Sequence, residues 1–108
     1  MSSDYVRVGR ADEFPNGEIK KFAGEGLEVA IVSWRDKFFA FTNQCTHMGY
    51  AFHDGGFISP DNEIICTAHF ACYDIETGDQ VDGPGYSGLA IFDVKVEDGD
   101  VLVARLPK

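Results

Sequence analysis

Two short segments each combine a cysteine with a histidine, and both residue types bind metal ions. Cys45 and His47 lie two positions apart in CTHMGY, and Cys66 and His69 lie three positions apart in CTAH. Together they offer two thiolates and two imidazoles, enough for a tetrahedral zinc ion or for a cluster of two irons and two sulfides. Zinc sites usually draw paired cysteines from one element and paired histidines from another. One ligand of each type in each segment therefore favours a centre with two metal ions.

The composition is that of one compact, acidic domain. The chain has 108 residues, of which 44% are hydrophobic and 25% are charged, and its formal net charge is −9. This length predicts one domain, residues 1–108, with a single core. Because no run is rich in Lys or Arg, we expect neither nucleic acid nor an anionic membrane surface as a partner. A protein partner with a basic surface is the natural complement.

The sequence shows no signal for export or for membrane insertion. No stretch approaches the roughly 20 apolar residues that span a bilayer, and MSSDYVRVGR at the start has no long apolar run. Three cysteines suit two ligands and one spare thiol better than a disulfide framework. We therefore expect a soluble, cytoplasmic protein; a secreted chain after signal cleavage is the alternative.

Short alternating runs separated by Gly and Asp predict an antiparallel all-β fold, a sandwich or an incomplete barrel. One hairpin is predicted from LEVAIVS (27–33) and FFAFT (38–42), and another from LAIFDVKV (89–96) and VLVARL (101–106). The turn of the second hairpin contains Asp-Gly, a strong hairpin signal. Weaker strands are predicted at VRV (6–8), EIKKF (18–22), NEIICT (62–67) and ACYDI (71–75). No segment shows helical periodicity over ten residues.

Both Cys/His pairs lie in the segment from about residue 43 to about residue 84. Loops longer than about 12–15 residues usually have a function or a structure of their own. We therefore predict a small subdomain within this segment that binds the metal centre.

The motif CTHMG followed by CTAHFACYD resembles the signature of Rieske [2Fe–2S] proteins, in which two histidines replace two cysteine ligands. The resemblance extends to the hairpin before the first pair and to the closing IFDVKVEDGDVLVARL, and so covers nearly the whole chain. It implies that Cys45 and Cys66 bind the inner iron and that His47 and His69 bind the outer, solvent-facing iron. Two thiolates neutralise the oxidised core, so an electron is added more easily than to a core with four thiolates.

The resemblance also indicates how the reduction potential is set. Tyr50 and Ala68 stand where high-potential members of the family have the two cysteines of a disulfide, and Ala71 stands where they have a serine. Tyr73 occupies the position of a tyrosine that donates a hydrogen bond to a cysteine sulfur. With one of the two hydroxyl donors absent, we expect a low to intermediate potential.

Other residues in this region have simpler interpretations. We expect Cys72 to be a small buried apolar residue and His53 to be a surface histidine. The segment GPGYSG (83–88) matches a dinucleotide-binding pattern but lacks the helix that would follow it, so we expect a turn. Thr67 and Phe70 stand where the family usually has Pro and Gly, which leaves the shape of the second loop open. Four apolar residues are either core or a rim where a partner docks: Met48, Tyr50, Phe52 and Phe70.

With all four cluster positions filled by protein, no iron is open to a substrate, and we expect an electron carrier rather than an enzyme. The resemblance implies a monomeric ferredoxin that passes electrons from an NAD(P)H-dependent flavin reductase to a terminal Rieske oxygenase, often of aromatic-compound degradation. A stable Rieske subunit, as in nitrite reductase, is the alternative. A zinc-stabilised interaction module is the third possibility.

Replacing Tyr73→Phe should lower the midpoint potential of the cluster, because the cysteine sulfur loses a hydrogen-bond donor that stabilises the reduced state. A redox titration followed by visible absorbance measures the change. An unchanged midpoint would remove this role from the tyrosine hydroxyl.

Overall fold

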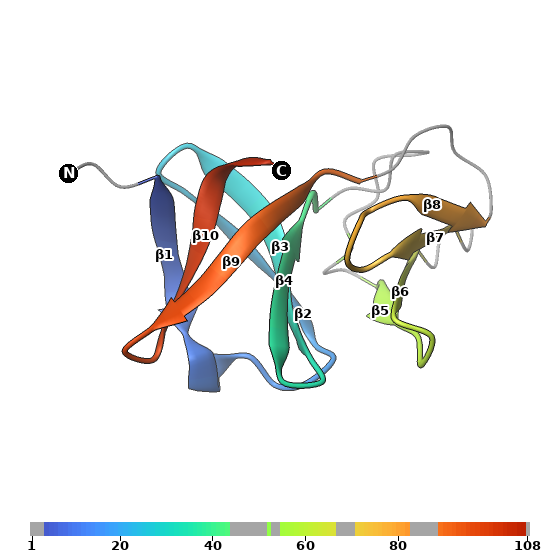
Figure 1. Cartoon of the computed structure of the whole chain (residues 1–108), viewed down its shortest axis with the longest axis horizontal. Helices are drawn as coiled ribbons and strands as arrows, with labels where there is room; N and C mark the ends of the chain where they lie inside the picture. Colours follow the sequence, from blue (N-terminus) through green and yellow to red (C-terminus); the bar gives the residue numbers. More distant parts are fainter. Residues whose placement is uncertain (1–3, 44–51, 53–54, 67–70, 83–88, 108) are drawn as a thin grey trace.

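The computed structural model describes residues 4–43, 52, 55–66, 71–82 and 89–107. Its strands form two antiparallel sheets that lie next to each other (Figure 1). The predicted antiparallel all-β fold is confirmed. Ala11–Glu13 forms a 3-10 turn, Phe52 also has the 3-10 conformation, and no described helix has the length and apolar character needed to cross a membrane.

The larger sheet has six strands in the order β1-β10-β9-β4-β3-β2 and curls into an incomplete barrel (Figure 1). Its strands are β1 (Tyr5–Arg10), β2 (Ile19–Gly24), β3 (Leu27–Trp34), β4 (Lys37–Phe41), β9 (Ile91–Glu97) and β10 (Asp100–Pro107). Across its open side, the Arg105 guanidinium donates a hydrogen bond of 2.8 Å to the Glu25 carbonyl. This contact links β10 to the turn between β2 and β3.

The smaller sheet has four strands in the order β5-β6-β7-β8. Its strands are β5 (Phe57–Ile58), β6 (Glu63–Cys66), β7 (Ala71–Asp74) and β8 (Gln80–Asp82). β6 and β7 were predicted from the sequence, whereas β5 and β8 were not. Strands of two and three residues are too short to show an alternating pattern.

Both predicted hairpins form, and each closes with a two-residue turn. Arg35 and Asp36 have φ values of 52° and 67°, and Asp98 and Gly99 have values of 54° and 83°. Positive φ at both central residues is typical of a type I′ turn, whose twist matches that of the paired strands. Asp-Gly favours this turn by itself, whereas Arg-Asp depends on contacts elsewhere in the fold.

The buried apolar residues form two clusters rather than the single core that the chain length predicted. In β3, Val29 and Ile31 pack inside the barrel, whereas Ala30 and Val32 pack toward the smaller sheet. All four side chains are at most 1% exposed. Because successive residues of a strand point to opposite faces, a strand covered on both sides contributes to two clusters at once.

The turn of the β3–β4 hairpin holds the two sheets together. Trp34 Nε1 donates a hydrogen bond of 2.7 Å to Asn62 Oδ1, at the turn between β5 and β6. The Arg35 guanidinium lies 5.3 Å from the Trp34 ring centroid and donates to the Pro60 carbonyl at 2.9 Å. The only tryptophan of the chain is therefore a reporter of this junction.

Replacing Asn62→Gly should loosen the junction, because the half-buried Trp34 N–H loses its partner while glycine keeps the positive φ of 64°. We expect a loss of about 1–3 kcal/mol in stability and a red shift of the tryptophan emission. Asp98→Gly, at a φ of 54° in the β9–β10 turn, is the matched control for the entropy cost of glycine. Equal thermal midpoints and emission spectra for the two variants would contradict the role of this hydrogen bond.

Candidate metal centre

Of the four predicted ligands, Cys66 lies in the part of the chain that the structure describes. Its side chain is the last of β6, is 3% exposed and packs in the cluster between the two sheets. A buried thiol at the end of a strand suits a ligand of an inner metal ion. The other three predicted ligands lie outside the described residues: Cys45, His47 and His69.

The segment that carries the first Cys/His pair starts and ends at one point of the barrel. The Phe52 N–H donates a hydrogen bond of 3.3 Å to the Asn43 carbonyl, so the two ends of residues 44–51 are tied together. Just before this point, the Thr42 N–H donates to the Ala90 carbonyl at 3.0 Å, which anchors it to the residue that precedes β9. Asn43 is 4% exposed, although its side chain is polar.

The segment that carries His69 starts at Cys66 and ends at Ala71, which are paired across β6 and β7. The Phe52 ring connects the ends of this second segment to the ends of the first. It packs edge-on against Phe41 of β4, at 5.6 Å between centroids, and against Tyr73 of β7, at 6.0 Å. Both ligand-bearing segments are thus anchored on one buried aromatic group.

Phe52 is 1% exposed, so this residue belongs to the core rather than to a docking rim. Tyr73 is fully buried on the face of β7 that packs toward the barrel. Cys72 lies on the opposite face, in the row with Ile65, and is half-buried rather than buried as predicted. Neither Cys66 nor Cys72 forms a disulfide.

Gly56 permits a close approach of two backbones beside this aromatic group. Its N–H donates a hydrogen bond of 2.7 Å to the Phe52 carbonyl. A Cβ at this position would lie 2.9 Å from the Phe52 carbonyl oxygen and 3.0 Å from that of Ile65. The close approach at Gly56 and the hydrogen bond from Phe52 to Asn43 were not predicted from the sequence. A glycine before a strand and an asparagine after one are common in any β protein and carry no signal.

These positions fit a centre that takes ligands from both segments. The ends of the two segments meet at Phe52, and the buried Cys66 thiol lies at the start of the second one. Among the described residues, no group of three or more His, Cys, Asp and Glu could hold a metal ion. Several residues interpreted from the sequence lie outside the described part: Met48, Tyr50, His53, Thr67, Ala68, Phe70 and the segment 83–88. Their interpretations stay predictions.

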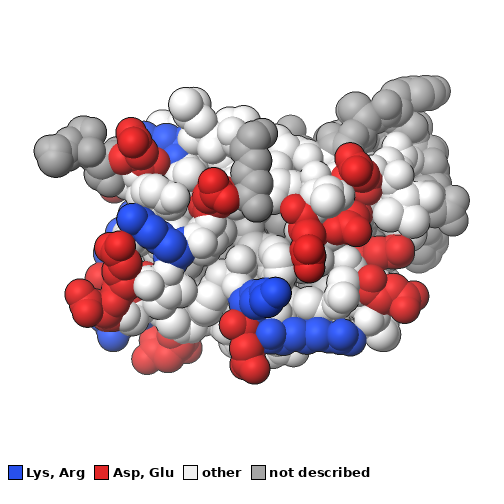
Figure 2. All heavy atoms as spheres, viewed as in Figure 1, with Lys and Arg blue, Asp and Glu red and all other residues white. Residues whose placement is uncertain are grey.

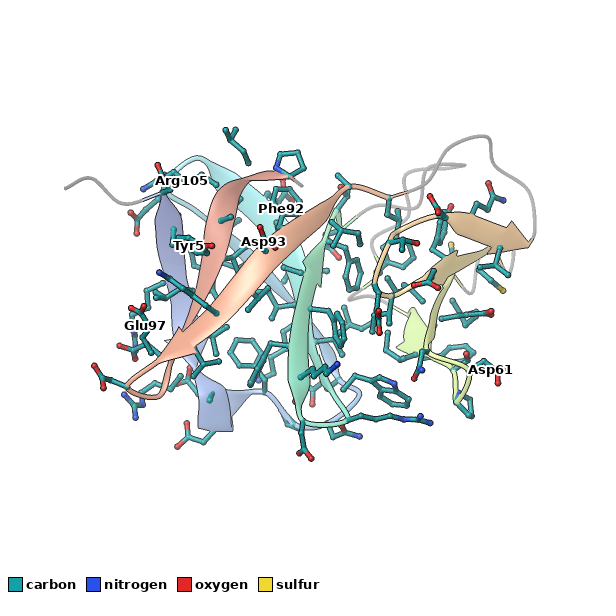
Figure 3. The ribbon with its side chains drawn as sticks, in the orientation of Figure 1. Tyr5, Asp61, Phe92, Asp93, Glu97 and Arg105 are labelled. Carbon is teal, nitrogen blue, oxygen red and sulfur yellow. The ribbon has the colours of Figure 1, made fainter. Side chains whose placement is uncertain are left out.

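Charge is distributed unevenly between the two sheets. Residues 38–94 contain eight Asp and Glu and no Lys or Arg, so all nine basic residues lie in the remaining sequence. On the face shown in Figure 2, Lys and Arg lie over the barrel and its β3–β4 turn, whereas Asp and Glu extend over the smaller sheet as well. Figure 3 shows Asp61 at the turn between β5 and β6. Glu63 lies directly across from Asp74, a like-charge pair that costs stability.

This charge has two consequences for a redox centre held by the smaller sheet. Negative charge near a cluster opposes the addition of an electron, which is consistent with the low to intermediate potential predicted from the sequence. The same field attracts a partner with a basic surface.

Comparisons with known proteins agree with the motif. The model of the Rieske [2Fe–2S] domain matches residues 4–93. The biphenyl dioxygenase ferredoxin subunit of Pseudomonas sp. (strain KKS102) is 29% identical over 99 residues, which cover 92% of this chain and 90% of that protein.

Two solved structures share the fold over almost their full length. The ferredoxin of carbazole 1,9a-dioxygenase from Nocardioides aromaticivorans IC177 has a TM-score of 0.86 and 31% identity, covering 98% of this chain and 100% of that one. A chain from a complex of reduced oxygenase and oxidized ferredoxin in carbazole 1,9a-dioxygenase has a TM-score of 0.88 and 26% identity, covering 99% and 98%.

Replacing Gly56→Ala should reduce the amount of cluster bound per chain, because the added methyl group forces the Phe52 and Ile65 backbones apart. We expect a cost of about 1–3 kcal/mol, as for other overpacked positions. Iron and acid-labile sulfide per chain, together with visible absorbance, measure the effect.

Gly24→Ala is the control for this change, because a Cβ there meets only the Phe22 side chain, at 3.3 Å. Cluster content that falls equally in both variants, or in neither, would show that the close approach at Gly56 does not support the centre.

Proposed function

The chain belongs to the Rieske [2Fe–2S] domain family, and on this basis we propose that it passes single electrons from an NAD(P)H-dependent flavin reductase to a terminal Rieske oxygenase. Membership of the family gives the protein one Rieske-type [2Fe–2S] cluster, which accepts and releases one electron. Its relatives are ferredoxin components of oxygenase systems, so the chain is an electron carrier and not itself an enzyme. This favours the ferredoxin over a stable subunit of another reductase.

We assign the ligands as Cys45 and Cys66 for the inner iron and His47 and His69 for the outer iron. The spacing of the two pairs supports the assignment, as does the burial of Cys66 at the junction of the two sheets. A thiolate in this position is shielded from water by the surrounding side chains. The imidazoles of the outer iron would then provide the surface through which an electron enters and leaves.

Buried aromatic residues hold the described ends of the two predicted ligand-bearing segments in place, which favours a rigid site. Phe41, Phe52 and Tyr73 are each at most 1% exposed, and Phe52 contacts the other two rings edge-on, so the described ends of the two segments cannot separate without opening the core. A rigid site changes its geometry little when an electron arrives. That small reorganisation favours rapid electron transfer, in the way that pre-organised sites favour chemistry.

The oxygenase partner is supported by the solved complex of a similar ferredoxin with its oxygenase. For the reductase, the support is the chemistry, since a one-electron carrier needs a flavin to divide the two electrons of NAD(P)H. We place the protein in the cytoplasm, where NAD(P)H is available, and assign the pathway to aromatic-compound degradation by analogy with the biphenyl system. Contacts of redox partners are small, below about 1,200 Å² in total, and are formed quickly when charges are complementary.

Electron transfer to the cognate oxygenase should slow several-fold when the ionic strength rises from about 50 to about 500 mM, because salt screens the acidic field. Stopped-flow mixing of the reduced protein with oxidised oxygenase, followed by the visible absorbance of the cluster, measures the rate. Failure to reoxidise the cluster at any ionic strength would refute the proposed function.

Two charge reversals localise the interaction. Asp79→Lys changes an exposed residue that precedes β8 of the smaller sheet, and Glu18→Lys makes the same change at an exposed position beside β2 of the barrel. We expect the rate to fall more for Asp79→Lys. Equal rates for the two variants would show that the acidic smaller sheet does not face the partner.

A further inference from the structure

The barrel is open between its two end strands, and a cavity lies at this opening. β1 and β2 stand at opposite ends of the six-stranded order and have no pairing with each other in the described structure. The cavity has a volume of about 360 Å³, within the range of small-molecule sites. Its apolar lining comes from Val8, Phe14, Phe22 and Ile31. These residues belong to or contact the apolar cluster inside the barrel.

Lys20 introduces a positive charge on this apolar surface. It pairs with Ile31 across β2 and β3, so its side chain lies on the face of the strand that points into the barrel. The residue is half-buried, and its ammonium group is 6.0 Å from the centroid of the Phe14 ring. A lysine on the inner face of a barrel is unusual unless something balances its charge.

The other two charged residues of the cavity have partners already. Lys21 Nζ lies 3.7 Å from Glu28 Oε2, on the opposite face of β2. Glu13 Oε1 accepts a hydrogen bond of 3.0 Å from the Arg10 N–H. Of the charged residues that line the cavity, Lys20 is therefore the one with no carboxylate partner in the described structure.

From these contacts, we propose that the cavity between β1 and β2 binds a small organic acid, with an apolar ring or short chain against Phe14 and Phe22 and its carboxylate at Lys20. The apolar ring or chain packs against the apolar side chains of the cavity, and the carboxylate supplies the counter-charge that Lys20 lacks. The proposal is independent of the electron-transfer function, since the cavity lies in the barrel and none of the predicted ligands lines it.

The acidic character of the whole protein does not prevent an anion from binding here. Eight of its carboxylates lie in residues 38–94, which do not contribute to the cavity. The rest of the chain carries nine basic and ten acidic residues and is therefore close to neutral. At physiological ionic strength, exposed charges are screened beyond about 8 Å.

Titration of the oxidised holoprotein with phenylacetate, followed by amide chemical shifts in NMR spectra, tests the proposal. We expect saturable shifts confined to β1, β2 and Phe14, and no saturable shifts with phenethylamine, which has the same ring but a positive charge. Lys20→Met keeps the aliphatic stem and removes the charge, and it should weaken binding by about tenfold or more. Lys20→Arg should retain binding, because the charge remains.

Lys37→Met is the control, since it removes the same charge from an exposed lysine at the start of β4 that does not line the cavity. Its affinity for phenylacetate should stay within a factor of about two, because only screened exposed charge changes. An unchanged visible spectrum of the cluster verifies that each variant is folded. The proposal is overturned if phenylacetate gives no saturable shifts, if phenethylamine binds equally well, or if Lys20→Met binds like the unmodified chain. In each of those cases, the role of Lys20 is limited to preventing edge-to-edge association of the edge strand β2.

Discussion

The packing of the Phe52 ring between Phe41 and Tyr73 is the contact on which the predicted metal centre depends. Phe41 belongs to the barrel and Tyr73 to the smaller sheet, so one side chain joins the two sheets at the place where both ligand-bearing segments begin. Each edge-on aromatic pair contributes about 0.5–1.5 kcal/mol beyond its buried area. Removing a buried phenylalanine ring typically costs about 3–5 kcal/mol, a large fraction of the stability of a domain of this size. Stability and cluster geometry are therefore coupled through the same side chain.

The β3–β4 hairpin has a similar double role on a larger scale. One face of β3 fills the barrel, the other face supports the smaller sheet, and its turn holds the β5–β6 turn through Trp34 and Arg35. The smaller sheet can thus remain short, with strands of two to four residues, because its apolar face rests on a surface that the barrel supplies. A four-stranded sheet this small would bury too little apolar surface to be stable alone.

The charges divide the molecule into an acidic smaller sheet and a nearly neutral barrel. In an electron carrier, this separation would serve two purposes, since acidic groups near a cluster held by the smaller sheet lower its potential and also attract a partner with a basic surface. The nearly neutral barrel has an opening between β1 and β2, with Lys20 on its inner face. Electron transfer and the proposed binding of a small acid would then occupy different parts of one small fold.

The sequence alone indicated the Rieske cluster that the family confirms, because residue type and spacing are local properties. Its ligands, Cys45, His47, Cys66 and His69, are predicted from the same spacing. The sequence also predicted both long hairpins, from the alternation of their strands and, in the second, from the Asp-Gly turn, which are local properties. Only the tertiary structure decided that Phe52 is core, that β3 is buried on both faces and that Cys72 lies on the outer side of β7. Burial depends on which segments meet, and Phe52 packs between Phe41 of β4 and Tyr73 of β7, in two different sheets, which no local pattern predicts. The hydrogen bond from Trp34 to Asn62 joins residues 28 positions apart and was unpredictable for the same reason. The close approach at Gly56 was unpredictable because it depends on how the chain folds back on Phe52 and Ile65.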